Sequence, residues 1–211
     1  MKKYALGCGG ILILLVVIAG MSGCNSYNRL VGLSQNVDSK WADVQNVYQR
    51  RADLIPNLVS TVSGAANFEK STLTEITQAR ASVGQVKVDP SKAPDDPNQL
   101  EAYQQAQNQL SGALSRLLVV VERYPELRAT SNFRDLQTQL EGSENRIAVE
   151  RRNFNEAVQN YNTVAQRFPG VIFARLFGYK PKPYFQAQAG SENAPKVNFD
   201  FGKPAAAPAK P

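Results

Sequence analysis

Glu141 and Glu144 lie three residues apart in a segment with helical periodicity, and two neighbouring carboxylates can act as a general acid and base. The groups that most often work beside such a pair are missing. The sequence contains no histidine, and both cysteines, Cys8 and Cys24, lie near the N-terminus. Because the commonest bases and nucleophiles are absent, the two glutamates are better explained as solvated helix charges. We therefore expect no catalytic residue and no enzyme activity.

Composition also argues against a metal or cofactor site. Beyond residue 24 there is no thiolate or imidazole to bind a transition metal. The adjacent carboxylates Asp95 and Asp96 lie in a proline-rich loop, where Asp96 precedes Pro97 as a helix cap would, with Gln99 closing a capping box. No glycine-rich loop follows a strand pattern. We expect neither a metal nor a cofactor.

The charge distribution makes nucleic acid an unsuitable partner. The formal net charge is +6, and the basic residues are spread along the chain. A nucleic-acid-binding protein usually gathers them in a dense patch with interleaved aromatic residues. We therefore expect no nucleic-acid partner.

The N-terminus predicts membrane attachment. Residues 4–24 read "YALGCGGILILLVVIAGMSGC", with no charge between Lys3 and Arg29. A helix of this length can cross a hydrocarbon core of about 30 Å. One interpretation is an uncleaved single-pass anchor. The other is a lipoprotein signal, in which the small residues of "MSGC" precede Cys24 as the lipid-attachment residue. The early start of the apolar run and Met21, where leucine is usual, favour the uncleaved anchor.

The positive-inside rule predicts the orientation. The lysines at residues 2 and 3 should stay in the cytoplasm, which leaves the rest of the chain outside it. We divide the chain into an anchor or lipoprotein signal at 1–25, a helical domain at 26–185 and an extended to disordered tail at 186–211. Within the domain, "VIFARLFGYKPKPYF" at 171–185 should pack back onto the helices as irregular or short helical structure.

Apolar residues recur every three or four positions along four segments, which is the period of a helix. Two segments are long, 27–66 and 132–168, and two are shorter, 71–87 and the stretch from Pro97 to the residues before Pro125. The seam of the first comprises Leu30, Ser34, Val37, Trp41, Val44, Tyr48, Arg51, Ile55, Leu58, Val62 and Ala65. The seam of the last comprises Phe133, Leu136, Leu140, Ser143, Ile147, Glu150, Phe154, Ala157, Tyr161, Val164 and Phe168. We expect an all-α fold: an apolar anchor helix, an elongated antiparallel four-helix bundle and an irregular C-terminal tail.

Two charges interrupt the seams of the long helices. Arg51 and Glu150 both occupy positions that should face the core, where a charge must be paired or reach solvent. We predict that Arg51 pairs with Glu150, or that either pairs with a nearby charge such as Glu144 or Arg146, and that the pair sets the register of the helices. The alternative is that both side chains extend outward to solvent.

Pro56 lies inside the first long helix, in "RRADLIPNLVSTV" at 50–62. The apolar phase is the same before and after it, which a broken and restarted helix would have no reason to preserve. We predict one continuous helix with a kink or bend at Pro56, where the carbonyl of Ala52 loses its helical partner.

Several stretches, in order along the chain, resemble the LemA family of bacterial proteins. They are "YNRLV" (27–31), "RRADLIPNLVSTV" (50–62), "TLTEITQARA" (72–81), "YPELRA" (124–129), "NFRDLQTQLEGSENRIAVERRNFNEAVQNYN" (132–162), "FP" (168–169) and "APKVNF" (194–199). The resemblance implies a membrane-associated antiparallel helical bundle with an N-terminal apolar anchor. It does not imply an enzyme.

These observations predict a membrane-tethered scaffold or protein-interaction module of the bacterial cell envelope. Its partners would be the membrane, through residues 4–24, and envelope proteins that the sequence does not identify, and the oligomeric state is not predicted. Arg50, Arg151 and Arg152 are the candidate interaction surface. The alternative is an envelope protein that uses these arginines and Arg51 to bind lipid headgroups or a cell-wall polymer.

Overall fold

The computed structural model describes residues 2–65 and 68–187, and for residues 2–16, 18 and 19 it describes the backbone only. The predicted tail from residue 188 onward lies outside the described residues. The helices are α1 (Lys2–Ser63), α2 (Lys70–Gln85), α3 (Pro97–Val121), α4 (Pro125–Ala129), α5 (Ser131–Gln166) and α6 (Gly170–Leu176). Among the described residues there is no strand. The all-α prediction is confirmed.

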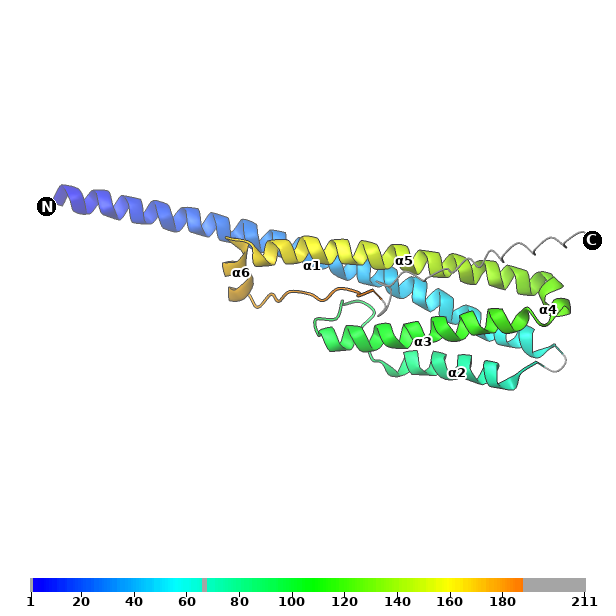
Figure 1. Ribbon diagram of the computed structural model, residues 1–211. Coiled ribbons are helices and arrows are strands. Elements are labelled where there is room, and N and C mark those ends of the chain that lie inside the picture. Colours follow the sequence, from blue (N-terminus) through cyan, green and yellow to red (C-terminus); the bar gives the residue numbers. More distant parts are fainter. Residues whose placement is uncertain (1, 66–67, 188–211) are drawn as a thin grey trace, which may run out of the picture.

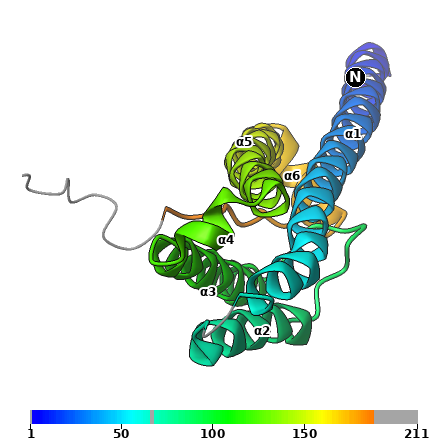
Figure 2. The same ribbon diagram turned by 90° about the vertical axis from the view of Figure 1, so that its right-hand side faces the viewer.

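The four longer helices lie side by side with alternating directions (Figure 1). α1 and α5 run antiparallel to each other, and α2 and α3 form a second antiparallel pair beside them. Viewed along their length, α1, α2, α3 and α5 are arranged around a common interior (Figure 2). The N-terminal part of α1 extends beyond α6 and every other described helix (Figure 1).

The predicted seam residues form the interior. Of the eleven residues in the first seam, nine are buried on α1, Ser34 is half-buried, and Ala65, just beyond the end of α1, is also half-buried. On α5 most are buried, but Phe168 is 81% exposed because the helix already ends at Gln166 and the chain turns before it. Helical periodicity therefore predicts burial only as far as the helix itself extends.

The ends of the helices follow local capping chemistry. Asp96 caps α3 as predicted, since its carboxylate accepts a hydrogen bond of 2.9 Å from the backbone N–H of Asn98. The predicted capping box does not form, because Gln99 donates instead to the carbonyl of Lys87 at 2.8 Å. α5 begins at Ser131, one residue before the predicted segment 132–168, and Thr130 is its cap, accepting from the backbone N–H of Phe133 at 3.4 Å.

α1 is one helix from Lys2 to Ser63, so the predicted anchor and the first long segment are continuous. It passes through Pro56, whose side chain is exposed, without interruption. The predicted continuity at Pro56 is therefore observed, whereas the kink stays a prediction. Among the residues whose side chains the structure describes, which leave out 2–16, 18 and 19, no helix has both the length and the hydropathy needed to cross a bilayer.

The buried apolar residues form two clusters along the length of the molecule. One contains Trp41, Tyr48 and Phe154 and lies toward α6, and the other contains Ile55 and Phe133 and lies toward α4. On α1 the two clusters meet between residues 48 and 55, which is where Arg51 is buried. A polar layer thus divides the core in two.

Candidate functional site

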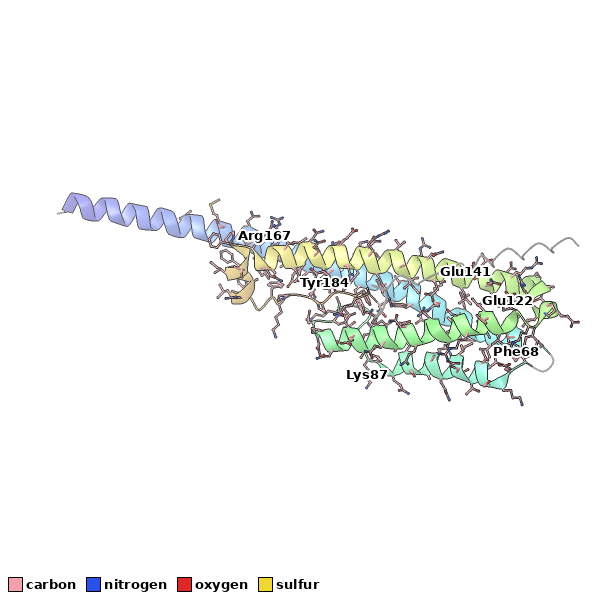
Figure 3. All side chains as sticks on the ribbon, viewed as in Figure 1. Phe68, Lys87, Glu122, Glu141, Arg167 and Tyr184 are labelled. Carbon is pink, nitrogen blue, oxygen red and sulfur yellow. The ribbon has the colours of Figure 1, made fainter. Side chains whose placement is uncertain are left out.

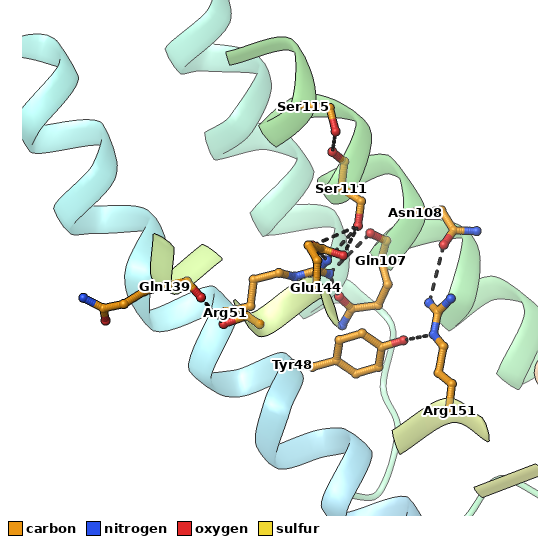
Figure 4. Close-up of polar contacts among 10 residues, drawn as sticks. Tyr48, Arg51, Gln107, Asn108, Ser111, Ser115, Gln139, Glu144 and Arg151 are labelled. Atoms are coloured by element: carbon orange, nitrogen blue, oxygen red, sulfur yellow. Dashed lines mark hydrogen bonds and ion pairs between the residues drawn. The ribbon is translucent and has the colours of Figure 1, made fainter. Parts of the chain in front are cut away.

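Arg51 on α1 is the centre of the polar layer, and only 1% of it is exposed. Its Nη1 donates to the hydroxyl of Ser111 at 2.7 Å and to the carboxylate of Glu144. Its Nη2 donates to the side-chain oxygen and, at 3.4 Å, to the carbonyl of Gln107. Gln107 and Ser111 are on α3 and Glu144 is on α5, so one guanidinium joins three helices (Figure 4). The Nε of Arg51 is buried without a hydrogen-bond partner among the described residues.

A second arginine lies on the other side of Tyr48 (Figure 4). Arg151 on α5 donates from Nε to the Tyr48 hydroxyl at 2.6 Å and from Nη2 to Asn108 at 3.4 Å. The guanidinium carbons of Arg51 and Arg151 lie 5.5 Å and 5.6 Å from the centre of the Tyr48 ring. Burial raises the pKa of Tyr48 to about 12, although the positive charge of Arg151 acts in the opposite direction.

Tyr103 on α3 extends the layer to Gln45 on α1. Its hydroxyl donates to Gln45 at 2.9 Å and accepts from the side-chain amide of Gln107 at 3.0 Å. The ring meets that of Tyr48 edge to face, with centroids 5.6 Å apart. Burial raises the pKa of Tyr103 as well. Each buried polar group of Gln107 therefore has a partner, an arginine on one side and a tyrosine on the other.

The structure pairs Arg51 with Glu144, the alternative partner, and not with Glu150. Glu150 instead accepts a hydrogen bond of 2.9 Å from Asn153 on its own helix. The reason is angular, because residues 144 and 150 lie on opposite sides of Ile147 around the axis of α5. The side that carries Glu144 faces α3, where Ser111 lies within 3.5 Å of its carboxylate, so Arg51 reaches a partner on each helix at once.

The remaining predicted residues do not share one face. Arg151 is half-buried against Tyr48, and the neighbouring Arg152 is exposed. Both line one shallow groove. Arg50 is exposed on α1 and makes no ion pair with any described residue. Cys24 is exposed on α1 as a free cysteine. The structure thus brings Arg51 and Arg151 together around Tyr48 and leaves Arg50 apart from them.

The carboxylates of Glu141 and Glu144 have separate partners. Glu141 accepts from Gln137 at 3.0 Å on the outside of α5, whereas Glu144 binds Arg51. In the described part of the chain, no group of three or more acidic or cysteine side chains is placed to hold a metal ion. The polar groups described above bind one another and do not converge on a cavity, so the arrangement joins helices.

Sequence reasoning missed a second set of polar contacts, which hold residues 179–187, here called the strap. The side-chain amide of Asn162 donates to the carbonyl of Lys182 at 2.9 Å and accepts from its N–H at 2.8 Å. Asn155 makes the same two bonds with Phe185, each 2.9 Å long. Gln104 on α3 binds both backbone groups of Gln186.

The spacing of these amides explains the path of the strap. Asn155 and Asn162 are seven residues apart, or about 10.5 Å along a helix. Lys182 and Phe185 are three residues apart, or about 10 Å in an extended chain. The signal in the sequence is weak but present, since buried asparagine beside a seam needs a partner.

Side chains of the strap complete one end of the core. Phe185 stacks on Trp41 with ring centroids 6.1 Å apart and meets Phe154 edge to face. Lys182 is only 6% exposed and donates to Asp95 at 3.0 Å, with Asp38 at 3.8 Å. The strap therefore ties the loop before α3 to α1 and α5.

A wide groove opens at the end of the molecule away from α6. Its volume is about 960 Å³. It is lined by the last turns of α1 and by the connection from α3 through α4 to α5: Ser60, Thr61, Gly64, Ala65, Arg123, Tyr124, Pro125, Glu126, Leu127, Thr130 and Asn132. We call it the distal groove. The groove is open to solvent and is not an enclosed cavity.

The chain resembles known proteins in sequence along most of its length. The family model described as "LemA family" matches residues 40–199. Magnetosome proteins MamQ 1 and MamQ 2 of Paramagnetospirillum magneticum are each 28% identical over 181 residues, which cover 79% of this chain and 66% of theirs. Protein LemA of Metamycoplasma hominis is 24% identical over 141 residues, which cover 67% of this chain and 60% of its own. The matched part is thus slightly less than two thirds of the length of these relatives.

Proposed function

The chain belongs to the LemA family, and from this premise we propose that it is a membrane-tethered helical scaffold that presents a surface to envelope proteins. No catalytic activity is part of the proposal. The observation that carries it is the placement of two features at opposite ends of α1. The apolar run of residues 4–24 occupies the end that extends beyond the other described helices, and the distal groove adjoins Ser60 and Thr61 at the other end.

Residues 4–24 are proposed to cross the membrane as an uncleaved anchor, with Lys2 and Lys3 in the cytoplasm and the four longer helices outside it as an antiparallel bundle. The continuity of α1 supports this proposal, because one rigid helix would carry the anchor directly into the bundle. From Cys24 to Ser60 the helix extends about 54 Å, so the distal groove would be held well away from the bilayer.

The mass of the intact protein extracted from membranes tests the mode of attachment. An uncleaved anchor retains residues 1–23, whereas a lipoprotein loses them and gains acyl groups on Cys24. Detection of the shorter, acylated form would contradict the single-pass proposal while leaving the tether itself in place.

The internal polar layer supports a role in shape and not in chemistry. Arg51, Gln107 and Glu144 bind one another across three helices, which holds the helices in one register. A rigid rod of this kind keeps a fixed distance between its anchor and its groove. The arginine-based alternative, a ligand site for lipid headgroups or a cell-wall polymer, gains nothing comparable, because Arg51 and Arg151 are already engaged inside the protein.

Site-specific photocrosslinking in the source membrane tests the scaffold function. A benzophenone amino acid at Glu126 or Asn132 places the probe in the distal groove, and Asn160, exposed on α5, provides the control position. We expect discrete crosslinked species of defined mass from the two groove positions and not from Asn160. The same diffuse background from all three positions would contradict the proposal.

A further inference from the structure

α6 buries small side chains and exposes large apolar ones, which is the reverse of the usual arrangement in a surface helix. The residues that it buries are small, Gly170 and Ala174, whereas Ile172 and Leu176 are 54% and 72% exposed. Ile172 and Leu176 are four residues apart and therefore lie on the same face. A surface helix ordinarily turns its large apolar side chains inward. α6 instead points Ile172 and Leu176 away from the rest of the protein, while Val171 and Phe173 are half-buried.

Two neighbouring aromatic residues enlarge this apolar surface. Phe168, just before α6, is 81% exposed, and Phe177, just after it, is 50% exposed. We call these four residues, Phe168, Ile172, Leu176 and Phe177, the α6 patch. Single exposed apolar residues are common on proteins, but a group of four within one short segment marks a surface that meets a partner.

Close packing fixes the position of the patch relative to α1. The ring of Phe173 lies over Gly23, where a Cβ atom would come within 2.9 Å of its Cε1. The rings of Tyr27 and Phe177 meet at a large angle with centroids 4.9 Å apart. At the start of α6, Gly170 lies so close to the carbonyl of Val164 that a Cβ atom would clash with it. The patch is therefore held at the level of residues 23–27 of α1.

Residues 23–27 of α1, beside which the α6 patch lies, are at the end of the apolar run at 4–24. The run extends about 30 Å as a helix, which is the thickness of a hydrocarbon core. Two described residues of the run near α6, Val17 and Met21, are 50% and 71% exposed. The apolar surface of α1 and the α6 patch therefore meet at one end of the molecule, with α6 at the depth where acyl chains give way to headgroups.

Positive charge predominates around α6, and the acidic residues Asp38 and Asp95 pair with Lys182 of the strap. Residues 1–37 and 157–187 contain no aspartate or glutamate. The exposed cations there include Arg29 after the apolar run and Arg175 on α6. Figure 3 shows Arg167 beside α6, with Glu141 and Glu122 far along the molecule. Arginine beside exposed apolar residues is typical of a surface that lies on anionic lipid.

We propose that the α6 patch docks on the lipid bilayer, with its apolar side chains at the boundary between headgroups and acyl chains and Arg167 and Arg175 at anionic headgroups. The proposal rests on the membrane tether described above and adds a second contact to it. A single helix leaves the bundle free to tilt and rotate, whereas a second contact fixes its orientation. α6 would thus set the direction in which the distal groove points.

Spin-label depth measurement on the full-length chain tests this docking. Ile172→Cys and Leu176→Cys place labels in the patch, and Val119→Cys on α3, 72% exposed, is the matched control. Both native cysteines are replaced by serine in these variants, and a fourth sample carries the label on native Cys8. Each protein is reconstituted in vesicles of equal parts phosphatidylcholine and phosphatidylglycerol, and collision of the label with oxygen is compared with collision with a water-soluble nickel chelate.

We expect the labels at 172 and 176 to collide more with oxygen than with nickel, and the label at 119 to show the reverse. Replacing Arg167 and Arg175 with glutamine should shift the label at 172 toward nickel. Nickel-accessible labels at 172 and 176 alongside an oxygen-accessible Cys8 would overturn the docking but not the tether. Labels at 172 and 176 shielded from both reagents would also overturn it and indicate a protein covering the patch. A nickel-accessible Cys8 would overturn the tether, and the docking with it.

Discussion

Arg51 and Glu144 form an ion pair in which the arginine side chain is 1% exposed and the carboxylate side chain 43% exposed. The two partners therefore contribute unequally. If the glutamate is lost, water and Ser111 can still meet part of the polar surface. If the arginine is lost, the buried Gln107 and the half-buried Ser111 are left without their donor at the junction of three helices, and a cavity replaces the guanidinium.

Arg51→Ala should lower the free energy of unfolding by about 3 kcal/mol, because it combines a buried cavity with unpaired buried polar groups. Glu144→Gln should cost about 1 kcal/mol, since the amide oxygen still accepts a hydrogen bond and the site is partly hydrated. Urea denaturation measures both values.

Glu150→Gln is the matched control for this pair. Its carboxylate accepts only from Asn153 on the same helix, so the change should stay within about 0.5 kcal/mol. A loss at Glu150 equal to that at Glu144 would contradict the observed pairing and favour the pairing first predicted from the seams.

The sequence predicted the helices well because their apolar residues repeat with the period of the structure itself. Each of the nine buried seam residues of α1 could be named from spacing alone. Spacing also marked Arg51 as a charged position in the core. It named Glu144 only as an alternative to Glu150, because periodicity along one helix carries no information on how a neighbouring helix is rotated about its own axis.

The sequence predicted that residues 171–185 pack back onto the helices as short helical or irregular structure, but it could not predict where the strap and α6 lie, for a different reason. Residues 179–187 have no repeating pattern, and their position depends on three amide side chains, Gln104, Asn155 and Asn162, that are distant in sequence. The buried face of α6 is made by Gly170 and Ala174, which no scale of hydrophobicity would select. Both segments are placed by tertiary contacts that leave only a faint local signal.

The raised pKa of Tyr48 predicts a loss of stability in alkaline solution. Its pKa is raised to about 12 in the folded protein from an ordinary value of 10.0, so the native state keeps the proton after the unfolded state has released it. The stabilising contribution is complete below pH 10 and is lost as the pH rises from about 10 to about 12. The free energy of unfolding should therefore decrease across this window, by about 2–3 kcal/mol for a shift of this size.

Tyr48→Phe isolates that contribution. At pH 8 the variant should be less stable than the parent, because the hydroxyl that accepts from Arg151 is gone. Between pH 10 and 12 its stability should fall less steeply than that of the parent. Parallel curves for the two proteins in this window would contradict the assignment of the buried proton to Tyr48.

Pro56→Ala tests whether the proline inside α1 is required. The residue is exposed and the helix is continuous through it, so alanine can restore the missing hydrogen bond to the carbonyl of Ala52 without entering the core. We expect the free energy of unfolding to rise by about 1–3 kcal/mol in urea denaturation. Asn57→Ala, at the next exposed position, should change it by only about 0.5 kcal/mol. Destabilisation by Pro56→Ala would mean that the core packs against a bend that the proline maintains.

Asn162→Ala should release the strap locally. The backbone N–H of Lys182 donates to Asn162 and that of Phe185 donates to Asn155, so each amide proton reports on one clamp. Hydrogen exchange should lose protection at Lys182 first and most strongly, with a smaller change at Phe185. Asn160→Ala, exposed on the same helix, should leave both amides protected. Equal loss of protection at every strap amide and in α5 would indicate general unfolding and contradict a local clamp.

A pair of glycines tests the placement of α6 on α5 through opposite effects. At Gly142, inside α5, a Cβ atom meets nothing within 4 Å, so Gly142→Ala should stabilise the helix by about 0.5–1 kcal/mol. At Gly170 the same atom would clash with the backbone carbonyl of Val164, which cannot move aside as a flexible side chain would. Gly170→Ala should therefore destabilise by about 1–3 kcal/mol. Thermal unfolding of the two variants should shift in opposite directions. A shift of the same sign in both would mean that α6 does not begin in close contact with the end of α5.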